Sequence, residues 1–282
     1  MPEYKTVLYD HVTPEVVRVA MNRPEARNAQ DLQLTRDLND AFDHANRDDN
    51  VKVIILSGEG PHFNSGHDMR GGTGLGFNDI PPVGTWANFD APGAEGAMAK
   101  EEEIYLQMCR RWRNLPKPMI AEVQGKTIAG GLMLAWVCDL IIASDDAEFR
   151  DLVVGWGIPG VEYFAHPWEF GHRGARQMLY TGDWVSAQDA HRMGMVNEVI
   201  PRDQLRERVE ELALKIAEKP LFGLKITKEA INQTQDAQGL WVAQQSVFIM
   251  HTLAHTHWRE ISGAGTYRGE GAPARPGSQK KS

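Results

Sequence analysis

The sequence predicts an α/β fold that continues into a helical region. Two apolar runs, Val51–Leu56 and Met119–Val123, have the length and continuity of buried strands. Each run is followed by a glycine turn, and the second turn leads into a helical segment at Gly130–Val137. Strands that alternate with helices are typical of α/β architecture with crossover connections. After Pro159-Gly160 the pattern becomes mainly helical.

The individual elements follow from the spacing of apolar residues. Strands show alternating or continuous apolar residues, whereas helices show apolar residues three or four positions apart. In chain order we expect a strand at Val16–Met21, a helix at Asp31–Asn46, a strand at Val51–Leu56, a helix at Glu101–Asn114, a strand at Met119–Val123, a helix at Gly130–Val137 and a strand at Leu140–Ala143. Amphipathic segments follow at Ala175–Tyr180, Ala187–Met193 and Gln204–Glu218, with long helices across Lys219–Thr256.

Three regions are expected along the chain. Residues 1–200 form the α/β core, residues 201–262 form the helical region, and residues 263–282 form a disordered tail rich in Gly, Pro and Lys. An insert near residues 70–100 is rich in Gly, Pro, Asn and Asp and contains Trp86 and Phe89. A loop of this length inside a domain is usually functional or disordered.

Composition restricts the possible classes of function. The chain has 282 residues, of which 42% are apolar, and a formal net charge of −8, so nucleic acid is not an expected partner. No run approaches the roughly 20 apolar residues that cross a bilayer, and the N-terminus lacks the pattern of a secretory signal. Cys109 and Cys138 form no CxxC pair or metal-ligand cluster. Reduced thiols in the cytoplasm are the simplest interpretation.

A group of histidines near the C-terminus raises the question of metal binding. His251, His255 and His257 lie close together on an expected helix, and His251 and His255 share a face at i, i+4. No acidic residue or cysteine lies between them or directly beside them. We therefore favour a solvated or interface-lining helix face and assign no metal ligand.

Two glycine turns carry the strongest chemical signal. FNSGHD (Phe63–Asp68) follows the first apolar strand, and IAGGLMLAWVCDL (Ile128–Leu140) follows the second. Glycine exposes neighbouring N–H groups because no side chain blocks the approach of another molecule. Two such turns aimed at one point would stabilise an anion without a charged side chain. The alternative is that these glycines only end the strands and begin the segments that follow.

Several motifs together resemble the crotonase (enoyl-CoA hydratase/isomerase) superfamily. In chain order they are MNRPEARNA, VKVIILSGEGPHFNSGHDM, GKTIAGGLMLAWVCDLIIAS, GIPG, GARQMLYTGDWVSAQDAHRMGMVNEVIP and KPLFGLKITKEAIN, and they cover most of residues 5–235. The resemblance implies a crotonase-type spiral of repeated ββα units with a C-terminal helical region. It implies homotrimers, commonly paired into hexamers (a dimer of trimers). It also implies an acyl-CoA thioester substrate, with coenzyme A as part of it and no tightly bound cofactor.

The same resemblance places an oxyanion hole on the backbone N–H groups of His67 and Gly130. Negative charge develops on the thioester oxygen when an acyl-CoA enolate forms. Gly130 would open a helix, so its N–H has no partner within the helix and lies at the positive end of the helix dipole. Gly66 would let the chain turn sharply and present the N–H of His67. Loss of one such donor typically costs roughly 100- to 1000-fold in rate.

Both glutamates with which hydratases of this family activate water are missing from the expected positions. Met133 stands at the first position, and Leu152 or Val153 stands at the second. None of these side chains can transfer a proton. Hydration by two glutamates is therefore in doubt.

Other side chains are candidates for acid–base chemistry, and Glu162 ranks first. It follows the GIPG turn among apolar residues, where burial could raise its pKa, although a solvated helix start is the alternative. Asp151 ranks second, because an odd offset along a strand would turn it away from the site. His67 could use its imidazole or only its N–H. His166, among aromatic residues, fits a packed structural role better than a place in the pocket.

Two loops are expected to contact coenzyme A. Ala26, Arg27 and Asn28 match the loop around the adenine end, where Arg27 is either a phosphate partner or an ordinary surface residue. Ser65, Gly66, Asp68 and Met69 would line the pantetheine path, and Gly131 and Met133 are assigned to substrate binding. Asp68 could instead cap or orient a following helix. The insert with Trp86 and Phe89 would wall the acyl pocket or form a subunit contact.

The sequence therefore predicts an acyl-CoA-processing enzyme of the enoyl-CoA hydratase/isomerase family, a lyase or isomerase of fatty acid metabolism. Other thioester chemistry by an isomerase, hydrolase or decarboxylase is an alternative, and decarboxylation needs the oxyanion hole more than it needs a base. A non-catalytic acyl-CoA binder is a further alternative. A serine-protease-like activity on the same fold is disfavoured, because Ser65 precedes the glycine of its turn rather than following it.

Overall fold

The computed structural model describes residues 3–70, 75–79 and 81–262, so the predicted tail at 263–282 lies outside the described residues. Among the described residues, a larger sheet has the strand order β1-β2-β3-β4-β6-β9 and a smaller sheet has the order β5-β7-β8. The strands are β1 (Val7–Thr13), β2 (Val16–Met21), β3 (Val53–Gly58), β4 (Met119–Val123), β5 (Lys126–Ile128), β6 (Leu140–Ser144), β7 (Glu148–Arg150), β8 (Val185–Ser186) and β9 (Glu198–Ile200).

Most of the larger sheet is parallel. β1 and β2 form an antiparallel hairpin, and the pairs from β2 through β9 run parallel. Parallel strands are covered on both faces and therefore carry continuous apolar runs. Every residue of β2, β3 and β4 is buried, as that rule requires. The α/β architecture predicted from the apolar runs is confirmed.

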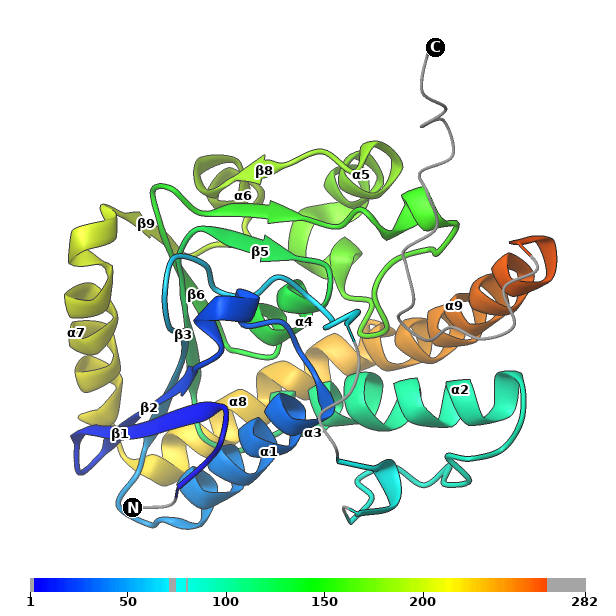
Figure 1. Cartoon of the computed structure of the whole chain (residues 1–282). Coiled ribbons are helices and arrows are strands. Elements are labelled where there is room, and N and C mark those ends of the chain that lie inside the picture. The colour runs from blue at the N-terminus through cyan, green and yellow to red at the C-terminus, as the bar shows by residue number, and fades with distance from the viewer. Residues whose placement is uncertain (1–2, 71–74, 80, 263–282) are drawn as a thin grey trace.

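From β4 to β7, consecutive strands alternate between the two sheets. β4 leads into β5 and then helix α4 (Gly130–Trp136), while β6 leads into β7, the short helix η4 (Val153–Trp156) and α5 (His166–Thr181). β4 pairs with β6 in the larger sheet, and β5 pairs with β7 in the smaller one. This repeated ββα unit is the predicted spiral, and Figure 1 shows β5 and β8 of the smaller sheet beside the strands of the larger sheet.

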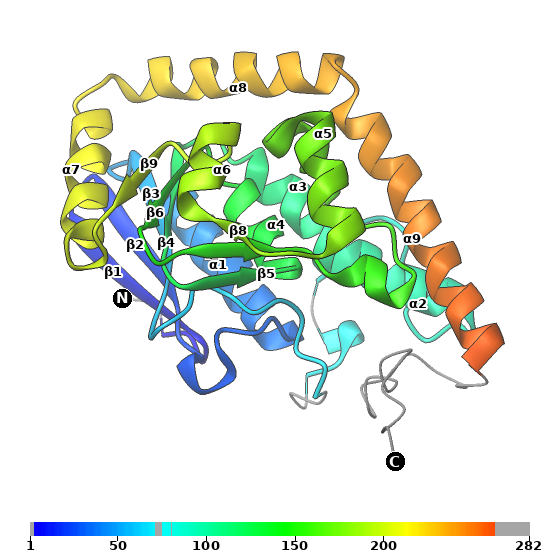
Figure 2. The same ribbon diagram turned by 90° about the horizontal axis from the view of Figure 1, so that it is seen from above.

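Helices cover the two faces of the larger sheet (Figures 1 and 2). Side chains along β3 alternate between the faces. Ile54 belongs to the main core with α1 (Leu32–Arg47), whereas Ile55 belongs to a second core with α7 (Leu205–Ala217). The side chains with which α7 covers its face of the sheet include Leu205, Val209, Ala213 and Ala217.

The C-terminal region ends in two long helices, α8 (Leu221–Ala237) and α9 (Leu240–Ser262). Figure 2 shows α8 along one edge of the molecule and α9 turning from its end toward α2 (Ala94–Glu101). A π-helical turn, η3 (Glu102–Gln107), joins α2 to α3 (Met108–Arg113). The remaining helices are η1 (Pro24–Ala26), η2 (Phe77–Asp79), α6 (Ala187–Met193) and η5 (Arg202–Gln204). Within the described ranges, no helix is long and apolar enough to cross a bilayer.

Candidate functional site

The two glycine turns lie side by side, one after β3 and the other after β5. Asn64 and Thr127 form an isolated parallel bridge, and the N–H of Ile128 donates to Asn64 O at 3.0 Å. A Cβ added at Gly66 would lie 2.9 Å from Ile128 O and 3.4 Å from Gly130 N. Gly66 also has φ of +88°, a conformation that favours glycine. The close approach of the two turns therefore depends on Gly66.

The backbone N–H groups of His67 and Gly130 differ from the neighbouring amides in their hydrogen bonding. The next amide in the first turn, that of Asp68, donates to Gln30 O at 2.7 Å, and the amide of Ala129 donates to Arg150 O at 2.8 Å. Across the described part of the chain, no hydrogen bond takes the N–H of His67 or Gly130. Gly130 is the first residue of α4, where the N–H has no partner in the helix.

The backbone just before Gly130 is strained. Ala129 has φ of 46° and ψ of −112°, a conformation that residues with a side chain rarely adopt. Such strain costs on the order of 1–3 kcal/mol and persists only where the surrounding structure imposes it. The turn is therefore held in the conformation that begins α4 with an amide that has no partner in the helix.

The side chain of His67 forms part of the site as well. Its ring stacks on Tyr105, with ring centroids 3.6 Å apart, and its Nε2 lies 3.7 Å from Oε2 of Glu162. Burial lowers the pKa of His67 to about 3, although the charge of Glu101 opposes this shift. The imidazole is therefore neutral near neutral pH and faces Glu162 rather than pointing away from the site.

A cavity of about 120 Å³ adjoins the two turns. It is walled by the turn after β3, the segment around η4, the turn that carries Glu162, and helix α9. The lining residues are Ser65, His67, Met69, Ile128, Ala129, Leu152, Val153, Trp156, Ile158, Val161, Glu162, His251 and His255. Among these described residues, Glu162 carries the one carboxyl group.

The two aromatic residues of the insert do not line this cavity. Phe89 packs against Phe77, with ring centroids 5.3 Å apart, and Trp86 is half exposed. The insert is instead fixed to η3, because the N–H of Gly84 donates to Oε2 of Glu103 at 2.8 Å. Residues of η4 and α9 therefore provide the wall that the sequence led us to expect from Trp86 and Phe89.

Glu162 is buried, with 3% of its surface exposed. Its Oε1 lies 3.5 Å from Nε2 of His251, and its Oε2 faces His67. Burial raises the pKa of Glu162 well above the usual range, and the nearby charges of Glu101 and Asp151 raise it further. Burial alone would also raise the pKa of Glu101, but the hydrogen bond and charge of His255 prevail and lower it.

Asp151 is engaged in a different place. Its Oδ2 lies 2.9 Å from Nε2 of His166, and both side chains are fully buried. Its carboxylate also accepts the N–H groups of Val153 at 3.1 Å and Val161 at 3.3 Å. Asp151 is not among the lining residues of the cavity. A structural role in holding the GIPG turn fits both Asp151 and His166.

Of the apolar residues that the sequence assigns to the expected glutamate positions, two line the cavity and one does not. Leu152 and Val153 both line the cavity. Met133 is fully buried on α4, and its Sδ accepts the N–H of Tyr163 at 3.3 Å. Met133 on α4 therefore contacts the backbone of the segment that carries Glu162.

The loop expected around the adenine end packs against the first glycine turn. The N–H of Ser65 donates to Arg27 O at 3.0 Å. Asn28 is fully buried, and its Nδ2 donates to Glu59 O at 2.9 Å and His62 O at 3.0 Å. Asn28 is therefore a structural residue of the loop, whereas Arg27 is exposed.

Asp68 and Gly131 also have identifiable structural contacts. The carboxylate of Asp68 lies 3.0 Å from Arg23 and 3.1 Å from Arg70. These contacts orient the turn. A Cβ at Gly131 would lie 2.4 Å from Asn64 O, so this glycine allows α4 to approach the first turn.

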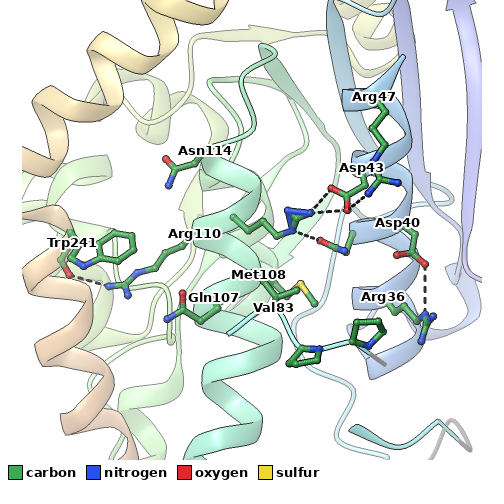
Figure 3. Close-up of a pocket in the computed structure, with 14 residues that line it drawn as sticks. Arg36, Asp40, Asp43, Arg47, Val83, Gln107, Met108, Arg110, Asn114 and Trp241 are labelled. Carbon is green, nitrogen blue, oxygen red and sulfur yellow. Dashed lines mark hydrogen bonds and ion pairs between the residues drawn. The ribbon is translucent and has the colours of Figure 1, made fainter. Parts of the chain in front are cut away.

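A larger cavity, of about 720 Å³, lies between α1, α3 and the start of α9 (Figure 3). Several of its charged side chains are paired, with Arg111 2.7 Å from Asp43. On its other side, Arg110 donates to Trp241 O at 3.0 Å and lies 3.8 Å above the Trp241 ring. These contacts attach α9 to α3. They thereby place the later turns of α9 at the smaller cavity.

Two residues that line the smaller cavity, His251 and His255, contact a carboxyl group to which the sequence does not connect them. Glu101 comes from the end of α2, and His251 and His255 come from α9. Nδ1 of His255 lies 3.0 Å from Oε1 of Glu101, and Nε2 of His251 lies 3.8 Å from Oε2 of Glu101. The i, i+4 spacing of the histidines is visible in the sequence, but no local signal links them to Glu101.

Comparison with known proteins agrees with this fold. The enoyl-CoA hydratase/isomerase family matches residues 12–270. The chain is 39% identical over 267 residues to "Putative enoyl-CoA hydratase EchA13" of Mycobacterium tuberculosis, covering 93% of this chain and 84% of that protein.

Solved structures show the same relationship. A probable enoyl-CoA hydratase from Mycobacterium smegmatis is 44% identical with a TM-score of 0.81, covering 91% of this chain and 97% of that one. A monofunctional enoyl-CoA isomerase from Mycobacterium smegmatis is 28% identical with a TM-score of 0.64, covering 82% of this chain and 94% of that one. The chain belongs to the enoyl-CoA hydratase/isomerase family, the crotonase superfamily.

Proposed function

We propose that this protein is an acyl-CoA enzyme that forms a thioester enolate. The N–H groups of His67 and Gly130 hold the enolate oxygen, because neither amide has an acceptor among the described residues and the two turns that carry them lie side by side. Glu162 transfers the proton, since it brings the one carboxyl group among the described residues that line the cavity.

Isomerisation of a double bond is the reaction that this arrangement favours. Addition of water to an enoyl-CoA uses two glutamates in this family, and Met133, Leu152 and Val153 provide neither. One carboxylate suffices to remove a proton from the carbon next to the thioester carbonyl and return it two carbons further along. The double bond then moves into conjugation, and no water is consumed. The similarity to a protein described as a monofunctional enoyl-CoA isomerase supports this choice.

The reaction is tested with matched pairs of 3-enoyl-CoA and 2-enoyl-CoA of several chain lengths. We expect the absorbance of the conjugated thioester to rise with the 3-enoyl substrates, with no 3-hydroxyacyl-CoA detected by mass spectrometry. Formation of 3-hydroxyacyl-CoA from 2-enoyl-CoA would instead identify a hydratase. Release of free coenzyme A or of carbon dioxide would identify a hydrolase or a decarboxylase. Tight binding of coenzyme A without turnover of any thioester would identify a non-catalytic binder.

Coenzyme A enters this scheme as part of the substrate. Ser65, Gly66 and Met69 are proposed to follow the pantetheine chain, since Ser65 and Met69 line the cavity. Ala26 and the exposed Arg27 are proposed to meet the adenine end, because their loop packs directly against the turn of Ser65. Replacement of Arg27 by Ala would then weaken coenzyme A binding without changing the rate at saturation.

The proposed assembly is a homotrimer or a dimer of trimers. Large apolar side chains on α8 and α9 support it, since Phe222 is 74% exposed and Val242 and Leu253 are each 66% exposed. Burial of such side chains against another copy removes apolar surface from water. Light scattering after size-exclusion chromatography measures the assembly directly. A cytoplasmic location is proposed on the basis of two buried, unpaired thiols, Cys109 and Cys138.

A further inference from the structure

We infer that Glu101, His251 and His255 form a binding site for a first-row divalent cation such as Zn²⁺, at the inner wall of the cavity next to Glu162. The three residues come from two helices, the end of α2 and the middle of α9. The inference does not depend on the proposed reaction, because it rests on the arrangement of these side chains.

The two histidines have the spacing of a helical metal site. Residues at i and i+4 lie on one face of a helix, and paired histidines at this spacing supply two ligands in helical zinc motifs. The rings of His251 and His255 have centroids 4.4 Å apart, and both residues are more than nine-tenths buried. Glu101 adds a carboxylate from the neighbouring helix. Two imidazoles and one carboxylate form a ligand set that zinc uses in proteins.

The distances between the ligand atoms are compatible with one shared ion. One nitrogen from each histidine and one oxygen from Glu101 all lie within 4.8 Å of one another. Zinc binds nitrogen and oxygen at about 2.0–2.2 Å, which places tetrahedral ligand atoms roughly 3.4 Å apart. The 3.8 Å between His251 Nε2 and Glu101 Oε2 is close to that separation and too long for a hydrogen bond.

The orientation of His251 provides the strongest argument. Its Nδ1 lies 2.8 Å from Gly160 O, and a carbonyl oxygen can only accept, so Nδ1 carries the hydrogen. In the neutral ring, Nε2 then presents a lone pair. A metal-binding histidine is oriented in the same way, by donating its other N–H to a backbone carbonyl or a carboxylate.

Acidic oxygen atoms surround that lone pair, which favours binding of a cation there. Nε2 of His251 is buried and makes no hydrogen bond among the described residues. The acidic oxygens facing it are Oε1 of Glu162 at 3.5 Å and Oε2 of Glu101 at 3.8 Å. A lone pair that faces two carboxylates is unfavourable unless a proton or a metal cation lies between them. A divalent cation satisfies all of these groups at once.

The site leaves room for a further ligand. His251, His255 and Glu162 all line the cavity, so the fourth position of a tetrahedral ion faces the space where an acyl group would lie. Three protein ligands with one open position are typical of zinc sites that contact a substrate or water. A bound cation would also join α2 to α9 and place positive charge beside Glu162.

The site is tested by titration of the metal-free full-length protein with Zn²⁺ in a calorimeter and with Co²⁺ in a spectrophotometer. We expect one ion per chain and the visible absorption of Co²⁺ with nitrogen and oxygen ligands. Glu101→Gln and His255→Gln should each weaken Zn²⁺ binding by about 100-fold or more. Loss of a residue that only hydrogen-bonds to a metal ligand already lowers metal affinity by roughly 10- to 100-fold. His257→Gln is the matched control, because His257 is exposed on the same helix.

Thermal unfolding separates loss of the site from loss of the fold. Zn²⁺ should raise the melting temperature of the wild-type protein and of His257→Gln, because a ligand that binds only the folded state stabilises it. It should leave the melting temperature of a folded Glu101→Gln protein unchanged. The inference is overturned if the wild-type protein binds no stoichiometric Zn²⁺ or Co²⁺, or if Glu101→Gln and His255→Gln bind Zn²⁺ as tightly as His257→Gln. A shared proton between Glu162 and His251 would then supply the positive charge.

Discussion

Oδ2 of Asp151 lies 2.9 Å from Nε2 of His166, and neither side chain is exposed to solvent. The same carboxylate accepts the N–H groups of Val153 and Val161, which flank the GIPG turn. One buried acidic residue thus ties β7, η4 and the first turn of α5 together. Glu162 follows directly after this tied segment, so Asp151 holds the backbone from which Glu162 reaches the cavity.

Replacement of Asp151 by Ala is expected to lower the free energy of unfolding by about 3–5 kcal/mol, because it leaves a buried histidine and two amides without their acceptor. Urea unfolding measures the loss. Asp183→Ala, at an exposed carboxylate, should stay within about 0.5 kcal/mol of the wild type. A stable Asp151→Ala protein that has lost turnover would argue for a direct chemical role instead.

Replacement of Glu162 by Gln should lower the rate at saturating substrate by about 100- to 10,000-fold, because the amide cannot transfer a proton. The affinity for coenzyme A should change little, since the contacts proposed for it lie in other segments. Steady-state kinetics with the preferred thioester and calorimetry with coenzyme A separate the two quantities. Glu260→Gln makes the same chemical change at an exposed position of α9 and should retain full activity. An unchanged rate in Glu162→Gln would exclude Glu162 as the proton carrier.

Replacement of Gly66 by Ala is expected to displace the N–H of His67 and lower the rate by about 100- to 1000-fold, the usual cost of losing one oxyanion donor. The added Cβ would lie 2.9 Å from a backbone oxygen, and φ is +88°, so the turn itself must shift. Gly223→Ala on α8 is the control, because a Cβ there meets nothing within 4 Å. It should leave activity intact and raise stability by about 0.5–1 kcal/mol. Equal activity of both variants would contradict the role of the His67 amide.

Lys117 makes the stability of the fold depend on pH. Its Nζ donates to Ala45 O at 2.8 Å and to Asp48 O at 2.6 Å. Burial lowers the pKa of Lys117 to about 8 from the usual 10.5. Between these pH values the unfolded chain binds a proton that the folded chain does not. Stability should therefore rise as the pH increases from about 8 to about 10.5, whereas below pH 8 the full cost of burying the charge is present.

Urea unfolding of the wild type and of Lys117→Met across this pH range checks the prediction. Met keeps the length of the side chain and removes the titrating group, so other ionising residues cancel in the difference between the two proteins. The difference in stability should move in favour of the wild type as the pH rises. Two curves that stay parallel would show that Lys117 keeps an ordinary pKa in the folded protein.

Much of the fold follows from the sequence, because buried parallel strands need long apolar runs. The runs expected at Val51–Leu56 and Met119–Val123 correspond to β3 and β4. The short strands β5 and β7, of three residues each, are not predicted, because a pattern of period two needs more residues to be recognised. The helix expected at Ala175–Tyr180 is part of the longer α5, whose pattern is interrupted at Gly171 with φ of 64°.

The candidate site is only partly predictable. The glycine turns are local features, and both lie where their strands imply. The direction of Asp151 is not predictable, because an uncertainty of one residue along an extended segment reverses the side chain. The contact between Glu101 and His255 joins distant parts of the chain, so it depends on how α9 docks onto α3 through Arg110 and Trp241.

The π-helical turn η3 makes the number of residues between α2 and α3 as important as their identity. α3 is anchored by Arg110, which contacts Trp241, while Glu101 lies just before η3. Each residue of a helix rotates the chain by about 100° and advances it about 1.5 Å. Because a π-helical turn accommodates about one residue more than an α-helical turn, deletion of a single residue from η3 would restore regular helical winding and leave Glu101 close to its present place. Deletion of a residue from the regular turns of α3 before Arg110 would instead rotate Glu101 by about 100° away from His255, and a relative with such a deletion would have a differently arranged cavity wall.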